Sequence, residues 1–180
     1  MSEIIQKLLE QLSSIAVDEH GDNFDHFTDF QIDSLIAKFE AIINFDPDNK
    51  YRYSREIEYG FTHQAFSFLA ELYMEKKEYE KARKAILKAV DLTEKIKNNE
   101  LYETFQSDNY YVLGMIYYLL GQTDKAMPCF ERSVELSNNH KAFLGMCLCY
   151  RKKRDLREAR ANLKMAKTLK ALLYTRYKIL

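Results

Sequence analysis

The sequence predicts an all-α protein made of stacked antiparallel helical hairpins, and two observations support this prediction. The first is the scarcity of turn residues: the 180-residue chain has 5 Gly and 2 Pro, whereas an all-β domain needs a turn about every 8–12 residues. The second is an apolar pattern at helical spacing that recurs three times along the chain. Because the glycines are scattered, the composition also argues against a glycine-rich phosphate loop and a dinucleotide-binding turn.

Each recurrence starts at a large residue, namely Phe66, Tyr110 or Phe143. An apolar residue follows at offset +3, a small residue at +4 and an aromatic residue at +7; a small residue then stands at +16, an apolar residue at +20 and a small residue at +23. Offsets 0 to +7 share one face of a first helix, and offsets +16 to +23 share one face of a second helix. The small residues should let the two helices of a hairpin approach closely, at the pairs Ala70/Ala82, Gly114/Ala126 and Cys147/Ala159. Since one hairpin cannot bury both of its faces, the hairpins should stack.

This pattern resembles the tetratricopeptide repeat family, whose 34-residue motif has the same order of large, small and aromatic positions. Three units match, at 63–96, 107–140 and 140–173. The resemblance implies a right-handed superhelix of stacked hairpins. The sequence departs from the family pattern in two ways: Phe or Tyr replaces the first-position Trp, and the proline that often ends the second helix is absent from all three units.

The segments outside the three units are expected to be helical as well, within one domain. Residues 1–62 should form an irregular N-terminal cap, with a helix at 3–17, an acidic loop at 18–30 and a half-repeat-like helix at 32–49 that ends at Asp46-Pro47 and packs through Phe39 and Ile42. Residues 97–106 should extend the two flanking helices, with Ile96, Leu101 and Phe105 facing inward. The last helix should continue to about Tyr177, and residues 174–180 should cap the C-terminal end, the apolar side being Leu169, Leu173, Tyr177 and Leu180.

The charges are unevenly distributed although the net charge is zero. Residues 1–62 carry 13 acidic and 5 basic side chains, whereas residues 141–180 carry 2 acidic and 12 basic side chains. The three cysteines give no disulfide framework, the start lacks a signal peptide, and no apolar run approaches the ~20 residues of a membrane helix. We therefore expect a cytoplasmic protein without membrane insertion, and the oligomeric state stays open.

The sequence offers no set of catalytic or metal-binding residues. Cys147 and Cys149 would point about 200° apart on a helix, so they cannot both ligate one metal ion. His20 and His26 lie among acidic residues that do not fit a calcium-binding loop. No hydrolase signature is present. We therefore expect no enzymatic activity, no metal and no cofactor.

The family resemblance implies that the first helices of the units line a concave groove that binds a peptide or helix of a partner protein. Carried over by register, the groove residues are Ser67, Glu71, Met74, Tyr111, Met115, Tyr118, Leu144, Leu148 and Arg151. The Lys and Asn residues of the family's carboxylate clamp are missing from these positions, so that subgroup's binding of chaperone C-termini is rejected. The expected function is a protein-interaction scaffold, with chaperone-like roles included.

Two alternatives remain open at this stage. The apolar strip Tyr111, Met115, Tyr118 and Leu148 can instead be covered by the protein's own termini. The basic cluster at 151–154, continued by Arg157 and Arg160, can bind nucleic acid through phosphate groups. No base-stacking aromatic residues accompany that cluster, so a nucleic-acid adaptor is the second choice.

Overall fold

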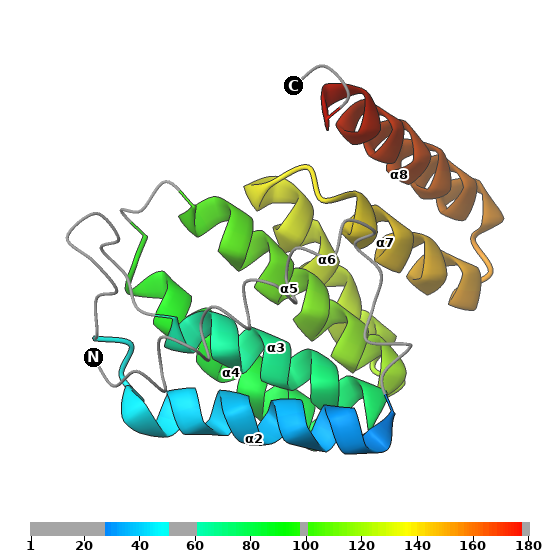
Figure 1. Ribbon diagram of the computed structural model, residues 1–180. Helices are drawn as coiled ribbons and strands as arrows, with labels where there is room; N and C mark the ends of the chain where they lie inside the picture. The colour runs from blue at the N-terminus through cyan, green and yellow to red at the C-terminus, as the bar shows by residue number, and fades with distance from the viewer. Residues whose placement is uncertain (1–27, 51–60, 98–100, 178–180) are drawn as a thin grey trace.

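The computed structural model describes residues 28–50, 61–97 and 101–177, with side chains up to Leu172. Within these residues the protein is all-α, with no strand (Figure 1). The helices are α2 (Asp29–Phe45), α3 (Thr62–Glu75), α4 (Tyr79–Glu94), α5 (Tyr102–Leu119), α6 (Thr123–Leu136), α7 (His140–Lys152) and α8 (Leu156–Tyr177). The predicted fold class is therefore confirmed.

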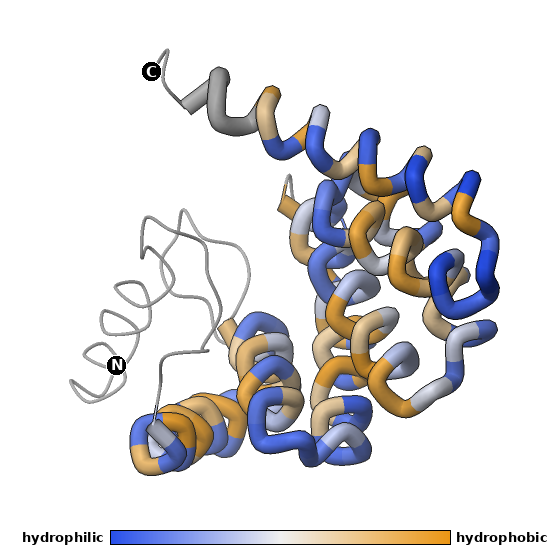
Figure 2. The backbone as a smooth tube through the Cα atoms, turned by 90° about the vertical axis from the view of Figure 1, so that its right-hand side faces the viewer, coloured by the Kyte–Doolittle hydropathy of each residue, from blue (hydrophilic) through white to orange (hydrophobic). Residues whose placement is uncertain are grey.

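The helices pair as three hairpins that stack along the chain. The most extensive contacts join α3 to α4, α5 to α6 and α7 to α8, and fewer contacts join α4 to α5 and α6 to α7. The first helices of successive hairpins are also in contact, α3 with α5 and α5 with α7. The helices α2 and α8 form opposite ends of the stack (Figure 1), and apolar residues gather where neighbouring helices face each other (Figure 2). Among the described helices, none combines the length and the apolar character that a membrane span requires.

The three hairpins share one turn geometry, which ends each first helix. The residue with positive φ is Lys77 (59°), Gly121 (79°) and Arg154 (62°). The next residue donates its backbone N–H to the carbonyl of the +7 tyrosine, from Glu78 to Tyr73 (2.8 Å), from Gln122 to Tyr117 (2.8 Å) and from Asp155 to Tyr150 (2.9 Å). This left-handed cap satisfies carbonyl groups that a helix end leaves open. Of the three residues, only Gly121 could be recognised from the sequence as one that favours positive φ, because lysine and arginine adopt this conformation at a cost.

The small residues at +4 and +16 are buried in all three hairpins, in agreement with the predicted register. The closest packing lies around Phe130, the +20 residue of the second hairpin, whose side chain is fully buried. A Cβ atom added to Gly114 on α5 would lie 2.6 Å from the Phe130 ring, and one added to Gly145 on α7 would lie closer still to the same ring. The ring therefore fits where the second and third hairpins meet because glycines on α5 and α7 leave room for it.

At the N-terminal end, α2 starts earlier than predicted. Thr28 caps the helix in a reciprocal pair with Gln31, so Asp29 and Phe30 belong to the helix and not to the acidic loop. Phe39 and Ile42 are buried, as predicted. The predicted helix at 3–17 and the acidic loop up to residue 27 lie outside the described residues.

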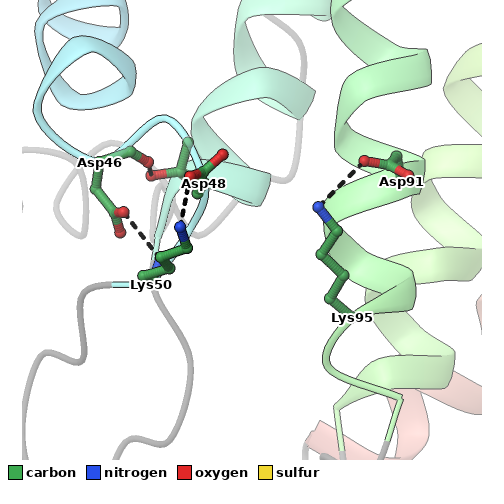
Figure 3. A network of polar contacts seen from close by, with 6 residues as sticks. Asp46, Asp48, Lys50, Asp91 and Lys95 are labelled. Carbon is green, nitrogen blue, oxygen red and sulfur yellow. Dashed lines mark hydrogen bonds and ion pairs between the residues drawn. The ribbon is translucent and has the colours of Figure 1, made fainter.

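The turn after α2 is tied to the start of α3 and to its own side chains. The Asp46 carbonyl accepts from the Thr62 hydroxyl at 2.6 Å, and the Asp46 carboxylate accepts from the backbone N–H of Lys50 at 2.8 Å. The Lys50 ammonium forms an ion pair with Asp48 at 2.7 Å, while Lys95 pairs with Asp91 on α4 (Figure 3). Of these contacts, the Thr62 hydrogen bond joins the end of α2 to the start of α3.

The predicted helix extension at 97–106 is only half correct. The helix α4 ends at Glu94 and a turn covers residues 95–97, so α4 does not extend, whereas α5 starts at Tyr102 and does extend. Phe105 and Ile96 are half-buried, but Leu101 is 45% exposed and does not face inward. At the other end of the chain α8 reaches Tyr177 as predicted, and the capping role of residues beyond Leu172 stays a prediction.

Candidate functional site

Two adjoining hollows lie along the first helices of the stack, between α3 and α5. The first has a volume of about 170 Å³ and is lined by Glu71, Met74, Glu75, Asp108, Tyr111, Val112, Met115 and Lys141. The second has a volume of about 270 Å³ and is lined by His63, Gln64, Ser67, Phe68, Glu71, Phe105, Asp108, Asn109 and Val112. Glu71, Asp108 and Val112 line both hollows, so the two form one continuous groove, which we call the α3–α5 groove.

Glu71 stands where the two hollows meet. Its side chain is half-buried, and desolvation raises the pKa of its carboxyl to about 7, with the nearby Asp108 and Glu75 acting in the same direction and Lys141 against it. Among the described residues, no hydrogen bond or ion pair reaches the Glu71 carboxylate. A buried carboxyl in this state holds a proton near neutral pH unless a cation is placed beside it.

Asp108 provides a second carboxyl from α5. Desolvation by the groove raises its pKa, while Lys141 and a hydrogen bond from Asn139 act in the opposite direction. The Asn139 amide donates to the Asp108 carboxylate at 3.1 Å. Because Asn139 and Lys141 belong to the start of α7, the third hairpin contributes directly to the electrostatics of the groove.

A buried polar network holds the α5 part of the groove in place. The Asn109 amide donates to the Thr93 hydroxyl on α4 at 3.0 Å, and the Ser67 hydroxyl on α3 bonds to the Asn109 side-chain oxygen. Gln106 donates to Glu94 at 3.0 Å. Gln106 lies in the N-terminal extension of α5, and Asn109 lies in the turn that follows, so the network ties the start of α5 to α3 and α4 and sets where Asp108 and Asn109 stand.

The structure brings five of the nine predicted binding residues together in the groove. These are Ser67, Glu71, Met74, Tyr111 and Met115. Tyr111 and Met115 also pack on the core cluster around Phe130, and the Tyr111 and Phe130 ring centroids are 6.3 Å apart. The strip that was expected to stand outside the core is thus partly core, and whether any of these residues binds a partner stays a prediction.

The other four predicted residues do not line the α3–α5 groove. Tyr118 is half-buried and carries the Lys152 ammonium over its ring, 5.4 Å from the centroid. Leu148 is half-buried, Leu144 is 40% exposed and Arg151 is exposed, all on α7. The nine predicted residues therefore divide into five on α3 and α5 that line the groove and four outside it, one on α5 and three on α7.

Sequence reasoning missed several lining residues, chiefly Asp108, Asn109 and Lys141. Asp108 and Asn109 precede the first motif position of the second unit, and Lys141 lies near the start of the third. Motif offsets do not cover these positions. The signal that could have found Asp108 and Asn109 is the polar run Gln-Ser-Asp-Asn at 106–109, directly before an apolar stretch; Lys141 has no such signal.

The basic surface near the C-terminus is partly engaged in contacts within the protein. Lys153 forms an ion pair with Asp124 at 3.0 Å, and Lys152 lies over Tyr118. Along α8, Arg157, Arg160 and Lys164 are exposed. The three cysteines are free thiols, and the described residues contain no cluster of three or more His, Cys, Asp or Glu side chains that could hold a metal ion.

Stacked antiparallel hairpins with a groove along their first helices define a helical-repeat solenoid of the protein-interaction class. Within that class the family is specific: residues 61–139 match the tetratricopeptide repeat model. This part of the chain, which includes α3 to α6, thus carries tetratricopeptide repeats, as the sequence pattern predicted.

Individual relatives are distant. Over 98 residues, or 53% of this chain, the sequence is 33% identical to the E3 SUMO-protein ligase RanBP2 of Homo sapiens and of Pan troglodytes, of which the match spans 3%. Among solved structures, BtubC (BKLC) from P. vanneervenii has a TM-score of 0.63 at 18% identity, covering 80% of this chain and 58% of that one. MamA (MSR-1 C2) has a TM-score of 0.58 at 19% identity, covering 94% of this chain and 93% of that one. At these identities the structural likeness supports the fold.

Proposed function

We propose that the protein is a non-catalytic interaction scaffold that holds a peptide or helix of a partner protein in the α3–α5 groove. The observation that carries the proposal is the pair of adjoining hollows on the first helices of two successive repeats. Their walls combine apolar side chains (Phe68, Val112, Met115) with polar side chains such as Glu71 and Asp108, and the space between the walls can hold a ligand group. Pockets of this mixed character are typical of binding sites. A chaperone-like role is a special case of the same proposal, and the free thiols fit action in a reducing compartment such as the cytoplasm.

The test starts from a random dodecapeptide display library selected on the full chain. The enriched peptide is titrated into isotopically labelled protein, and its binding surface is mapped by amide chemical-shift changes. We expect the changes to cluster on α3 and α5. Changes confined to α8 would move the function to the basic surface, and enrichment of no peptide at all would refute the proposal.

A matched pair of substitutions checks the surface independently. Met74 lines the groove and is half-buried, whereas Met165 lies exposed on α8. Met74→Ser should weaken the selected peptide about fivefold, since burial of part of one methionine contributes on the order of 1 kcal/mol. Met165→Ser should leave the affinity unchanged. Equal effects of the two variants would contradict the assignment, provided that both melt within a few degrees of the wild type.

A further inference from the structure

The α3–α5 groove contains a carboxylate that the protein itself does not neutralise. Glu71 lines both hollows, and no described residue gives it a hydrogen bond or an ion pair. The nearest cation to act on it is Lys141 on α7, which is exposed and attracts it without forming an ion pair. A half-buried carboxylate that lines a hollow and has no partner within the protein is a candidate for recognition of an external group.

Asp108, on α5, adds a second carboxyl group to the hollows that Glu71 lines from α3. It lines both hollows together with Glu71, and one hydrogen bond from Asn139 leaves most of its acceptor capacity unused. Two carboxyls, one from α3 and one from α5, thus face a common space. An anionic or phosphorylated peptide would be repelled from this space, so charge complementarity favours a cation.

The cation is better matched by an organic group than by a metal ion. Among the residues that the structure describes, no three oxygen, nitrogen or sulfur side chains of His, Cys, Asp or Glu converge closely enough for metal binding. The hollow beside Glu71 is instead walled by Met74, Val112 and Met115. Apolar walls that lead to a carboxylate suit a long aliphatic stem with a charged head, which is the shape of lysine and arginine side chains.

We propose that the Glu71–Asp108 hollow is a receptor for a lysine or arginine side chain of the partner peptide. The stem of that side chain lies along Met74 and Met115, and its ammonium or guanidinium group donates to the carboxylates of Glu71 and Asp108. This inference rests on the proposed function, because it assigns a ligand chemistry to the same groove.

The site should respond to pH in a defined direction. Burial holds the pKa of Glu71 near 7, and the groups that face it are Glu75 on its own helix, Asp108 and Tyr111 on α5, and Lys141 on α7. A bound cation favours the ionised carboxylate, so binding releases a proton below pH 7. The affinity for a lysine-containing peptide should therefore rise between pH 6 and pH 8.

The experiment repeats the dodecapeptide selection in parallel on the wild type, Glu71→Gln, Asp108→Asn and a control, Glu131→Gln. Glu131 is exposed on α6, so its substitution changes the net charge equally without touching the groove. We expect the peptides enriched on the wild type and on Glu131→Gln to share one basic position that is absent after selection on Glu71→Gln. Changing that basic residue to Gln in the best peptide should weaken binding to the wild type about tenfold or more, and to Glu71→Gln much less.

The outcomes separate this inference from the proposed function. Groove-mapped peptides without a basic position, or a tenfold loss that is the same in both proteins, would overturn the cation receptor and leave the groove function standing. Enrichment of no peptide at the groove would overturn both. An affinity that is flat from pH 6 to pH 8 in the wild type would also count against Glu71 as the group that meets the cation.

Discussion

Gly145 is the position at which one added methyl group should disturb the stack of hairpins most directly. A Cβ atom at Gly145 on α7 would overlap the fully buried ring of Phe130 on α6. The same ring atoms also lie against Gly114 on α5, where an added Cβ atom would stand 2.6 Å from the ring, so both glycines leave it little room. Gly145→Ala therefore tests whether the interface between the second and third hairpins is packed as tightly as the structure has it.

Two opposing terms set the magnitude. Replacing glycine by alanine within a helix favours folding by about 0.8–1.0 kcal/mol through helix propensity. Overpacking a tight core costs about 1–3 kcal/mol, and a Cβ position well within 3 Å of a fully buried ring places this case at the upper end. We expect a net loss of about 1–2 kcal/mol in the free energy of unfolding for Gly145→Ala.

The decisive control is the same substitution in a Phe130→Leu background. Leucine lacks the ring atoms that the new methyl group would meet, so only the propensity term should remain, and Gly145→Ala should then stabilise the protein by up to about 1 kcal/mol. Urea denaturation followed by far-UV circular dichroism, at constant m-value, measures all four proteins. An equal loss in both backgrounds would refute the packing argument, because the cost would then not depend on the ring.

Two further expectations concern the turn and the buried carboxyl. Gly121→Ala should destabilise the protein by about 1–2 kcal/mol through the positive φ of 79° alone, since no atom lies within 4 Å of the added Cβ. A Gly121→Asn variant that recovers part of this loss in the same urea assay would support the backbone as the cause. A Gly121→Ala variant as stable as the wild type would contradict it. For Glu71, the folded-state pKa of about 7 lies above the ordinary glutamate value of 4.5, so its contribution to the free energy of unfolding falls as pH rises from 4.5 through 7, by up to about 3 kcal/mol. The stability of the wild type and of Glu71→Gln, measured at pH 5 and pH 8, should show the wild type losing more. Parallel behaviour of the two proteins would speak against the raised pKa.

The helical hairpins could be predicted from the sequence because their packing depends on short-range periodicity. The small residues at +4 and +16 have no role other than close helix contact, so Ala70, Ala82 and Ala126 reveal the register wherever they recur. The turns were less visible: two of the three left-handed residues are Lys77 and Arg154, which carry no local signal for positive φ. The geometry of the hairpin imposes the conformation there against the residue's own preference.

The candidate site was predicted only in part, because it depends on segments that the repeat motif does not describe. The motif located Glu71 and Met74 on α3, but Asp108 precedes the first motif offset of the second unit, and this start of α5 is held by hydrogen bonds from Asn109 and Gln106 to α4. A polar network of this kind joins residues that are 12 to 16 positions apart and has no period. It becomes recognisable only when the helices are in place.

The +20 position shows most clearly that a side chain is buried in this fold when a neighbouring hairpin covers it, whatever its residue type. Ile86 and Phe130 are fully buried at +20 because the first helix of the next hairpin covers each of them. Leu163 has the same offset on α8 and is 36% exposed, since no further hairpin follows among the described residues. The same side-chain class at the same register thus stabilises an interface in two units and faces solvent in the third. The stability of a repeat unit in this protein is therefore set by its neighbour, which is why the second hairpin, covered on both sides, carries both the tightest packing at Phe130 and the α5 wall of the proposed groove.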